Sequence, residues 1–223
     1  MSNNSKTTVA AVKASLSSAR IATYEVATGV AADDDMSALV LYAWNAQVSG
    51  ALLAPLHICE VAIRNTVADV LEAVYGNEWP WSTSFERSLP DPIQGYSPRK
   101  DLQGTRASAL TTGKLIPELK FIFWQKMFTR RYDDRLWTHH LPRVLPNMDA
   151  STTVAERRLL IYNDLEQLRK LRNRIAHHEP IFTRVLANDY QKILNLVRCR
   201  CTATADWMHH NQTASTVISA KPF

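Results

Sequence analysis

The chain has 223 residues, 46% of them hydrophobic and 21% charged, a composition typical of a folded globular protein with one large domain or two small ones. Its three cysteines show no CxxC spacing, which argues against a disulfide-framed secreted domain and favours a reducing cytosol. No stretch approaches the roughly 18 apolar residues of a membrane-spanning helix, so we expect a cytoplasmic protein with neither membrane span nor signal peptide.

The net charge of +5 is unevenly distributed along the chain. Residues 1–150 carry equal numbers of basic and acidic side chains, so the whole basic excess lies in residues 151–223. A basic surface in that part favours a polyanionic partner such as RNA. A solvated helix face would have the same composition, so charge alone does not decide between them.

The first elements in chain order are helices. Val9–Thr28 has helix-forming composition and ends at Gly29, a residue suited to a helix C-terminus. Asp33–Asp35 supply N-cap and first-turn carboxylates for a helix whose apolar spacing continues from Met36 to about Tyr75. The candidate places for a break or kink in it are Gly50 and Pro55.

The middle of the chain alternates loops and short helices. Asn77–Pro98 is rich in Pro, Trp and Ser and predicts a packed loop, in which Trp79 and Trp81 are better explained as core anchors than as a base-stacking platform. A short helix, Arg99–Leu110, is expected to stop at Gly113.

An apolar helix is predicted over Ile116–Tyr132. Its aromatic residues indicate core or a dimer interface rather than a cofactor site. A short helix at Arg135–Leu141 and a proline-rich link, Pro142–Asn147, follow.

The last part of the chain contains a second amphipathic helix, from about Ser151 to His178. Its apolar residues recur at spacings of three and four: Ile161, Leu165, Leu168, Leu171 and Ile175. Its opposite side carries basic residues: Arg157, Arg158, Arg169, Lys170 and Arg174. A final helix covers about Val185–His209. With no repeat and no strand pattern, the sequence predicts an all-α bundle forming a single domain over residues 1–223, with residues 1–8 and 211–223 as candidate flexible tails.

The segment Leu171–Pro180, LRNRIAHHEP, carries most of the functional signal. Asn173 and His177 are four residues apart and share a helix face, while Arg172 lies about 100° around the helix. A proline at position 180 ends the helix, because the residue before proline avoids the α region. An arginine, an amide and an imidazole therefore gather at one helix end.

These residue types suit chemistry on a phosphate. In metal-independent RNA cleavage the ribose 2′-OH attacks its own phosphate, which requires a base, an acid and a cation. Histidine titrates near neutral pH, and arginine matches phosphate oxygens in a bidentate manner. One copy of the motif supplies one histidine of this kind, so a symmetric homodimer that apposes two motifs is expected. The alternative is that Arg172 and His177 only cap helix carbonyls.

RNRIAHHEPIF resembles the R-x4-6-H signature of the HEPN superfamily, and the wider chain is similar to its Abi-like abortive-infection members. Further likeness lies in LYAWNAQVSGALLAPLHICEVAIRNTVADVL, YGNEW, ELKFIFWQKMF and LPRVLPN, in family order between about Leu39 and Phe182. One departure is Ile122, where the family usually carries a glycine.

The resemblance implies an all-α HEPN fold, a homodimer and a metal-independent endoribonuclease that acts as a toxin in phage defence. Arg172 and His177 match the motif's catalytic pair and Asn173 its polar residue; His178 and Glu179 match the HHEP extension. An antitoxin or other regulatory partner is a further expectation. A non-catalytic HEPN module that binds RNA, a nucleotide or a protein is the alternative. We assign Arg169 and Arg174, on the basic side of the helix, together with His178 and Glu179, to substrate binding or to support of the catalytic residues.

A second group is Glu60, Arg64 and Asn65 in EVAIRN. Glu60 and Arg64 are four apart, in the favourable order for a helical ion pair. We interpret the pair as structural. The alternatives are that it orients the Arg172 site or adds a contact to a phosphate.

The sequence indicates neither a metal site nor a cofactor. The seven histidines are His57 and three adjacent pairs. The two members of such a pair point about 100° apart on a helix and rarely chelate one ion. HExxH, CxxC…H, P-loop and GxSxG patterns are all missing from the sequence.

Overall fold

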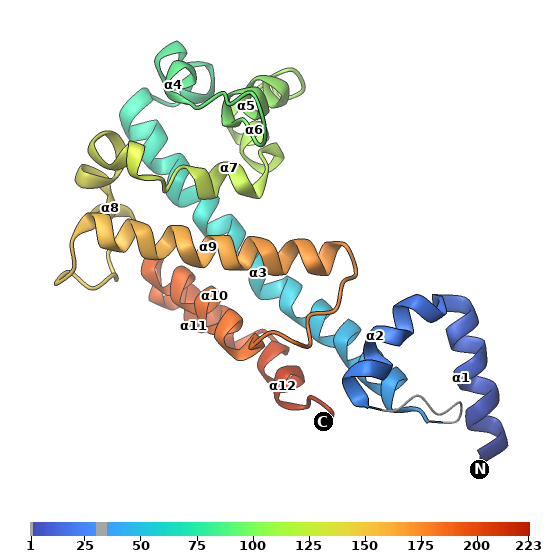
Figure 1. Cartoon of the computed structure of the whole chain (residues 1–223). Helices are drawn as coiled ribbons and strands as arrows, with labels where there is room; N and C mark the ends of the chain where they lie inside the picture. Colours follow the sequence, from blue (N-terminus) through green and yellow to red (C-terminus); the bar gives the residue numbers. More distant parts are fainter. Residues whose placement is uncertain (1, 30–34) are drawn as a thin grey trace.

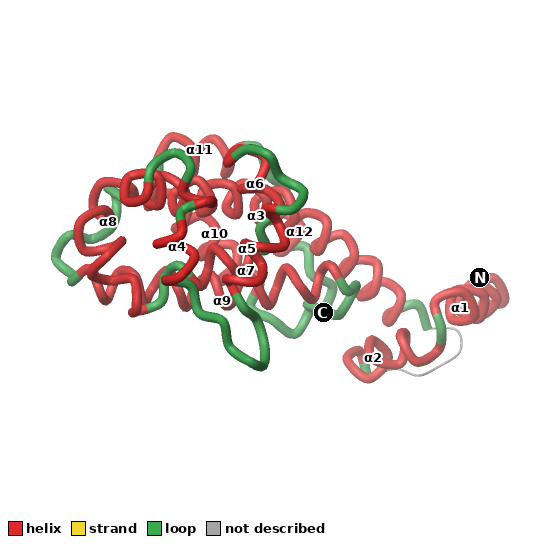
Figure 2. The backbone as a smooth tube through the Cα atoms, turned by 90° about the horizontal axis from the view of Figure 1, so that it is seen from above, coloured by secondary structure: helices red, strands yellow, loops and turns green. Residues whose placement is uncertain are grey.

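The computed structural model describes residues 2–29 and 35–223. All regular structure in these ranges is helical (Figures 1 and 2), so the predicted all-α class is confirmed. Figure 1 shows one long helix, α3, running from the N-terminal helices at one end of the molecule to α4–α6 at the other.

Helix α3 spans Ser37–Tyr75, 39 residues, and starts where Asp35 Oδ1 accepts the Ser37 N–H at 2.7 Å. Neither Gly50 nor Pro55 interrupts it, so α3 is one continuous helix without a break at either candidate place. A proline inside a helix costs about 3 kcal/mol. Leu52 and Leu56, on either side of Pro55, are buried, and each contributes about 1.5–3 kcal/mol. Burial of the two halves therefore offsets the lost hydrogen bond.

The helices that pack along α3 include α2 (Ser18–Thr28), α9 (Val154–Ala176), α10 (Leu186–Arg200) and α12 (Ala214–Ser219). By length and composition α3 is also a helix that could cross a membrane, although core helices pass the same test. The predicted absence of a membrane span stays a prediction.

The predicted N-terminal helix is two helices, α1 (Ser2–Leu16) and α2. Ser17 separates them with a left-handed φ of 72° and caps α2 through its side chain. The two helices form a hairpin joined by an ion pair of 2.5 Å between Lys13 and Glu25. Gly29 ends α2 with φ 68°, as predicted. Of the predicted capping carboxylates, Asp33 and Asp34 lie outside the described residues.

The predicted loop 77–98 contains a 3-10 turn, η1 (Trp79–Trp81), and a short helix, α4 (Thr83–Ser88). Trp79 is fully buried and meets Phe85 and Trp124 edge-to-face, which confirms its role as a core anchor. Gly113 does not stop the next helix. Helix α5 (Pro98–Arg106) ends earlier, and Gly113 lies within α6 (Thr112–Glu118).

The continuous aromatic helix predicted over Ile116–Tyr132 is wrong. Pro117 lies in the last turn of α6, and extended backbone at Leu119 and Lys120 separates α6 from α7 (Phe121–Lys126). Its aromatic side chains nevertheless lie in the core, where Phe128 stacks on Trp137 with ring centroids 4.3 Å apart. A 3-10 turn η2 (Arg130–Tyr132), a π turn η3 (Asp133–Trp137) and α8 (Thr138–Val144) complete this part.

Helix α9 begins with a capping box between Thr153 and Glu156. Its five predicted apolar residues are all buried, so this stripe is confirmed. Arg158, predicted on the solvent side, is buried instead. Its guanidinium binds both carboxylate oxygens of Asp133, with Nε at 2.8 Å and Nη2 at 3.1 Å.

The last predicted helix is also two helices, because Cys201 is extended between α10 and α11 (Thr202–His210). The C-terminal segment packs on α3: Trp44 Nε1 donates to the Val217 carbonyl at 2.7 Å, and Ala214 is buried. At the other end, residues 2–8 belong to α1.

Candidate functional site

The end of α9 is closed by a Schellman cap. The His178 N–H donates to the Ile175 carbonyl at 3.0 Å, and the Glu179 N–H donates to the Arg174 carbonyl at 2.8 Å. Such a cap places one residue in the left-handed region, and here it is His178, with φ 55°.

A histidine at this position is unfavourable. Glycine is the usual residue, because a Cβ in the left-handed region costs roughly 1–2 kcal/mol. The backbone conformation turns the chain sharply between two neighbouring histidines. His178 consequently faces a different direction from His177.

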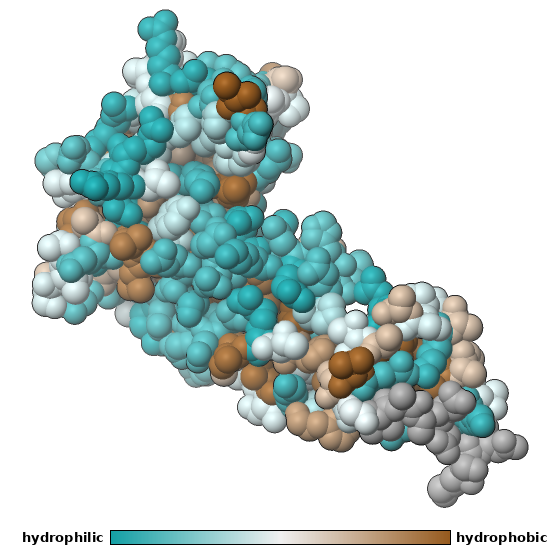
Figure 3. All heavy atoms as spheres, in the orientation of Figure 1, coloured by the Kyte–Doolittle hydropathy of each residue, from teal (hydrophilic) through white to brown (hydrophobic). Residues whose placement is uncertain are grey.

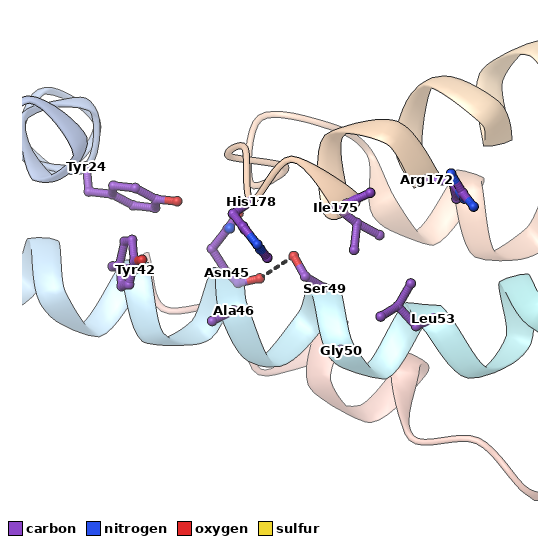
Figure 4. A pocket seen from close by; sticks show the side chains of 11 residues that line it. Tyr24, Tyr42, Asn45, Ala46, Ser49, Gly50, Leu53, Arg172, Ile175 and His178 are labelled. Carbon is purple, nitrogen blue, oxygen red and sulfur yellow. Dashed lines mark hydrogen bonds between the residues drawn. The ribbon is translucent and has the colours of Figure 1, made fainter. Parts of the chain in front are cut away.

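His178 lines a cavity of about 490 Å³ between α2, α3 and the end of α9. Figure 4 shows its ring pointing toward α3, over Asn45 and Ser49, with Arg172 further along α9. The cavity is lined by eleven residues in all: Tyr24, Tyr42, Asn45, Ala46, Ser49, Gly50, Leu53, Arg172, Ile175, Ala176 and His178. It combines an apolar wall with a few converging polar groups, as ligand sites commonly do.

Arg172 is exposed and has no hydrogen bond or ion pair with any other residue in the described ranges. A cation without an internal partner is available to an anionic ligand. Figure 3 shows that hydrophilic residues dominate the face over α9, so water and ligands have access to this side of the molecule.

Asn45 orients the opposite wall of the cavity. It is 6% exposed, and its Oδ1 accepts the Ile181 N–H at 2.8 Å. Because Oδ1 is held in this way, the other end of the amide is an NH₂ donor. Ser49 Oγ donates to the Asn45 carbonyl at 2.7 Å, which leaves that hydroxyl oxygen as an acceptor.

Two tyrosines close the end of the cavity nearest α2. Tyr24 and Tyr42 pack edge-to-face with ring centroids 5.0 Å apart. Burial, with a smaller contribution from Tyr42, raises the pKa of Tyr24 to about 12. Tyr24 therefore stays a neutral wall of the site at physiological pH.

The structure does not bring the whole predicted catalytic group together. Arg172 lines the cavity, whereas His177 and Asn173 do not. His177 is exposed, and its N–H donates to the Asn173 carbonyl at 2.9 Å. The helical period separates Arg172 from His177 by about 140°, so the two side chains leave α9 in different directions.

Arg174 and Glu179 hold the loop after α9. The Arg174 guanidinium donates to the Pro180 carbonyl through Nε at 3.0 Å and Nη2 at 2.7 Å. Glu179 Oε2 lies 3.6 Å from Arg174 Nε. These contacts fix the segment that carries His178, and neither residue lines the cavity.

Arg169 lies away from the cavity, on the side of α9 that faces α7. Its guanidinium pairs with Glu166 at 2.9 Å and donates to Gln125 Oε1 at 3.1 Å. Gln125 is fully buried and donates to the same glutamate at 2.7 Å. The network joins α7 to α9. The Arg169 guanidinium is bonded within it and points away from the cavity.

Glu60 and Arg64 form the predicted ion pair on α3. Both are half-buried, and neither they nor Asn65 lines the cavity. Asn65 is exposed and borders a separate hollow between α3, α10 and α11, together with Trp207 and Cys201.

Sequence reasoning missed the residues that α2 and α3 contribute to the site: Arg20, Tyr24, Tyr42, Asn45 and Ser49. Asn45 had a usable signal, since it is a polar residue among the apolar positions of a helix. Arg20 had none, because its partner lies 158 residues away in the sequence.

The cysteines differ in the pKa of their thiols. Hydrogen bonds from Thr204 lower the pKa of Cys201, whereas burial raises the pKa of Cys59 and Cys199. A lower thiol pKa gives more thiolate at a given pH and faster alkylation. We expect iodoacetamide at pH 7 to label Cys201 first, with Cys59 protected until the protein unfolds. Peptide mapping by mass spectrometry checks this order, and earlier labelling of Cys59 would contradict it.

Within residues 2–29 and 35–223, no three His, Cys, Asp or Glu side chains are grouped so as to hold a metal ion. Comparison of the chain with known protein families, with curated proteins and with solved structures gives no match.

Proposed function

We propose that this chain is a metal-independent endoribonuclease of the HEPN type, an Abi-like toxin that acts in antiviral defence. The observation that supports it best is the joint presence of an unpaired guanidinium and an imidazole, Arg172 and His178, at one cavity. An asparagine amide across the cavity adds a hydrogen-bond donor. Donors of this kind suit a phosphodiester, which becomes more negative in the transition state.

The chemistry follows from these groups. The ribose 2′-OH attacks the adjacent phosphorus while a base removes its proton. The P–O5′ bond breaks, and an acid protonates the leaving oxygen. Arg172 binds the non-bridging oxygens, whose charge rises in the pentacoordinate transition state. The products are a 2′,3′-cyclic phosphate and a free 5′-OH. Because the nucleophile is the 2′-OH, the substrate is RNA rather than DNA.

Acid and base require two titratable groups, and one chain presents one imidazole to the cavity. We propose a homodimer in which the ends of two α9 helices lie together, so that each composite site gains a second histidine. An antitoxin that covers this surface would silence the enzyme.

The test is cleavage of a fluorescently labelled single-stranded RNA by the purified protein in the presence of EDTA. We expect cleavage to persist in EDTA, to be absent with DNA of the same sequence, and to yield 2′,3′-cyclic phosphate ends detectable by mass spectrometry. Loss of cleavage in EDTA, or 3′-OH products, would contradict the mechanism.

A non-catalytic RNA- or nucleotide-binding module is the second candidate. It is favoured by the single imidazole in the cavity of one chain, which suffices for binding. This alternative predicts RNA binding without strand scission and normal growth of cells that overexpress the protein. Inducible expression beside a variant of the pocket histidine separates the two, because only an active toxin arrests growth.

A further inference from the structure

The most unusual backbone position near the cavity is His178. It occupies the left-handed position of the Schellman cap, with φ 55°, where glycine is favoured. Strained positions of this kind persist when the surrounding structure holds them, and they cluster at functional sites. The conformation turns the imidazole of residue 178 into the cavity (Figure 4), whereas His177 is not among the residues that line it.

Two long-range contacts and one local contact hold the backbone of this segment in place. Arg20 Nη1 on α2 donates to the His178 carbonyl at 2.7 Å. Arg174 donates to the Pro180 carbonyl, and Asn45 accepts the Ile181 N–H. All three contacts use the backbone of residues 178–181. The imidazole itself is exposed and has no hydrogen bond or ion pair in the described part of the chain, so the backbone sets its direction and its two nitrogens are available to a ligand.

Arg172 and His178 both lie on the α9 side of the cavity, whereas its α3 side mixes apolar residues with the neutral polar Asn45 and Ser49. Arg172 and His178 lie about one and a half helical turns apart on the α9 side, with Ile175 between them (Figure 4). Leu53 and Tyr42 line the α3 side. The volume of about 490 Å³ falls within the range of small-ligand sites. One nucleotide unit of an RNA strand, with its phosphate against the cationic side and its base against the apolar wall, suits this shape.

We propose that His178, rather than His177, is the imidazole that this cavity presents to an RNA phosphodiester, and that Arg20 is the positioning residue that holds it there. The identity of the ligand rests on the proposed function. The assignment of the histidine and of Arg20 rests on the geometry of the cap. The N-terminal α1–α2 hairpin thereby becomes part of the active site rather than an appendage.

Binding tests the proposal independently of cleavage. The probe is a single-stranded RNA with 2′-O-methyl riboses, which cannot form the 2′-oxyanion and is not cut. The imidazole resonances of the full chain are assigned by NMR with His177→Gln and His178→Gln variants. On addition of the probe we expect the His178 resonance to shift and the His177 resonance to stay within error. A shift of His177 alone, or no shift of either, would overturn the proposal.

His178→Gly separates function from folding, because glycine fits the left-handed position better than histidine. We expect its melting temperature to equal or exceed that of the wild type, with probe binding weakened at least tenfold. His177→Gly, which places glycine at the neighbouring position, should keep probe binding within twofold. Unchanged probe binding in His178→Gly would show that residue 178 only caps the helix, and would overturn the assignment of His178 to the RNA phosphodiester.

The positioning role of Arg20 is tested by measuring whether its replacement changes kcat or KM. We expect Arg20→Ala to lower kcat on cleavable RNA about tenfold with little change in KM or melting temperature, and Arg20→Lys to restore part of the rate. In the NMR experiment the free His178 resonance should broaden in Arg20→Ala. If the wild type binds the probe through His178 but cuts no RNA, the proposed function fails and the assignment stands. If His178→Gly cuts RNA at the wild-type rate, the assignment fails and the proposed function stands.

Discussion

Replacing Arg172 by alanine is expected to slow RNA cleavage by about a hundredfold or more, the usual loss when a donor to a developing oxyanion is removed. The physical reason is that the guanidinium has no partner among the described residues and lies in the same cavity as His178. Its charge is therefore available to the phosphate. The melting temperature should stay within about 1 °C, because an exposed side chain without internal contacts contributes little to stability.

Two further variants sharpen this result. Arg172→Lys keeps the charge but not the bidentate geometry, so we expect an intermediate rate. Arg87→Ala removes an exposed arginine of α4 and serves as a control with the same change in net charge. An equal loss of cleavage in Arg87→Ala would show that only overall charge matters. A full rate in Arg172→Ala would exclude Arg172 from the mechanism.

Much of the fold follows from periodicity. The buried stripe of α9, from Ile161 to Ile175, lies at the positions predicted from spacing alone, because one face of a helix at that spacing must be covered. The departures from local propensity fall where tertiary packing outweighs it. Pro55 does not break α3, since both halves of that helix are buried, and Cys201 interrupts a continuous pattern in the last helix.

Only part of the candidate site could be predicted from the sequence. The motif at 171–180 gave the location of Arg172 and of the two histidines, but not which imidazole enters the cavity. That choice depends on the left-handed turn at His178, which Arg20 and Asn45 hold from elements far away in the sequence. Spacing along one helix carries no information about such contacts.

The basic excess of residues 151–223 is largely neutralised by acidic residues in the folded chain. Most of the arginines there have acidic partners in the structure, including Arg158 with Asp133 and Arg200 with Asp69. The partners of both lie in the first 150 residues, so a count of charges by segment overstates the local field. Recognition of a polyanion therefore depends on the few cations left unpaired, and among these Arg172 lines the cavity that also contains His178.

The buried ion pair between Arg158 and Asp133 is expected to be the most sensitive point of the fold. Arg158→Ala should lower the free energy of unfolding by about 3 kcal/mol, the lower end for breaking a buried pair. The Asp133 side chain is only 19% exposed and would lose its guanidinium partner. At about 2–4 °C per kcal/mol for a chain of this size, the melting temperature falls by roughly 6–12 °C. Urea unfolding followed by circular dichroism measures the loss.

Arg157→Ala is the matched control, since Arg157 is the neighbouring residue of α9 and has no ion pair among the described residues. We expect it to change stability by less than about 1 kcal/mol. Removing both charges in Asp133→Asn/Arg158→Met should recover most of the loss, because a buried pair replaced as a whole leaves no uncompensated charge. Equal effects of Arg157→Ala and Arg158→Ala would show that the pair does not anchor η3 to α9. The rigid α9 that presents Arg172 and His178 would then depend on its apolar stripe alone.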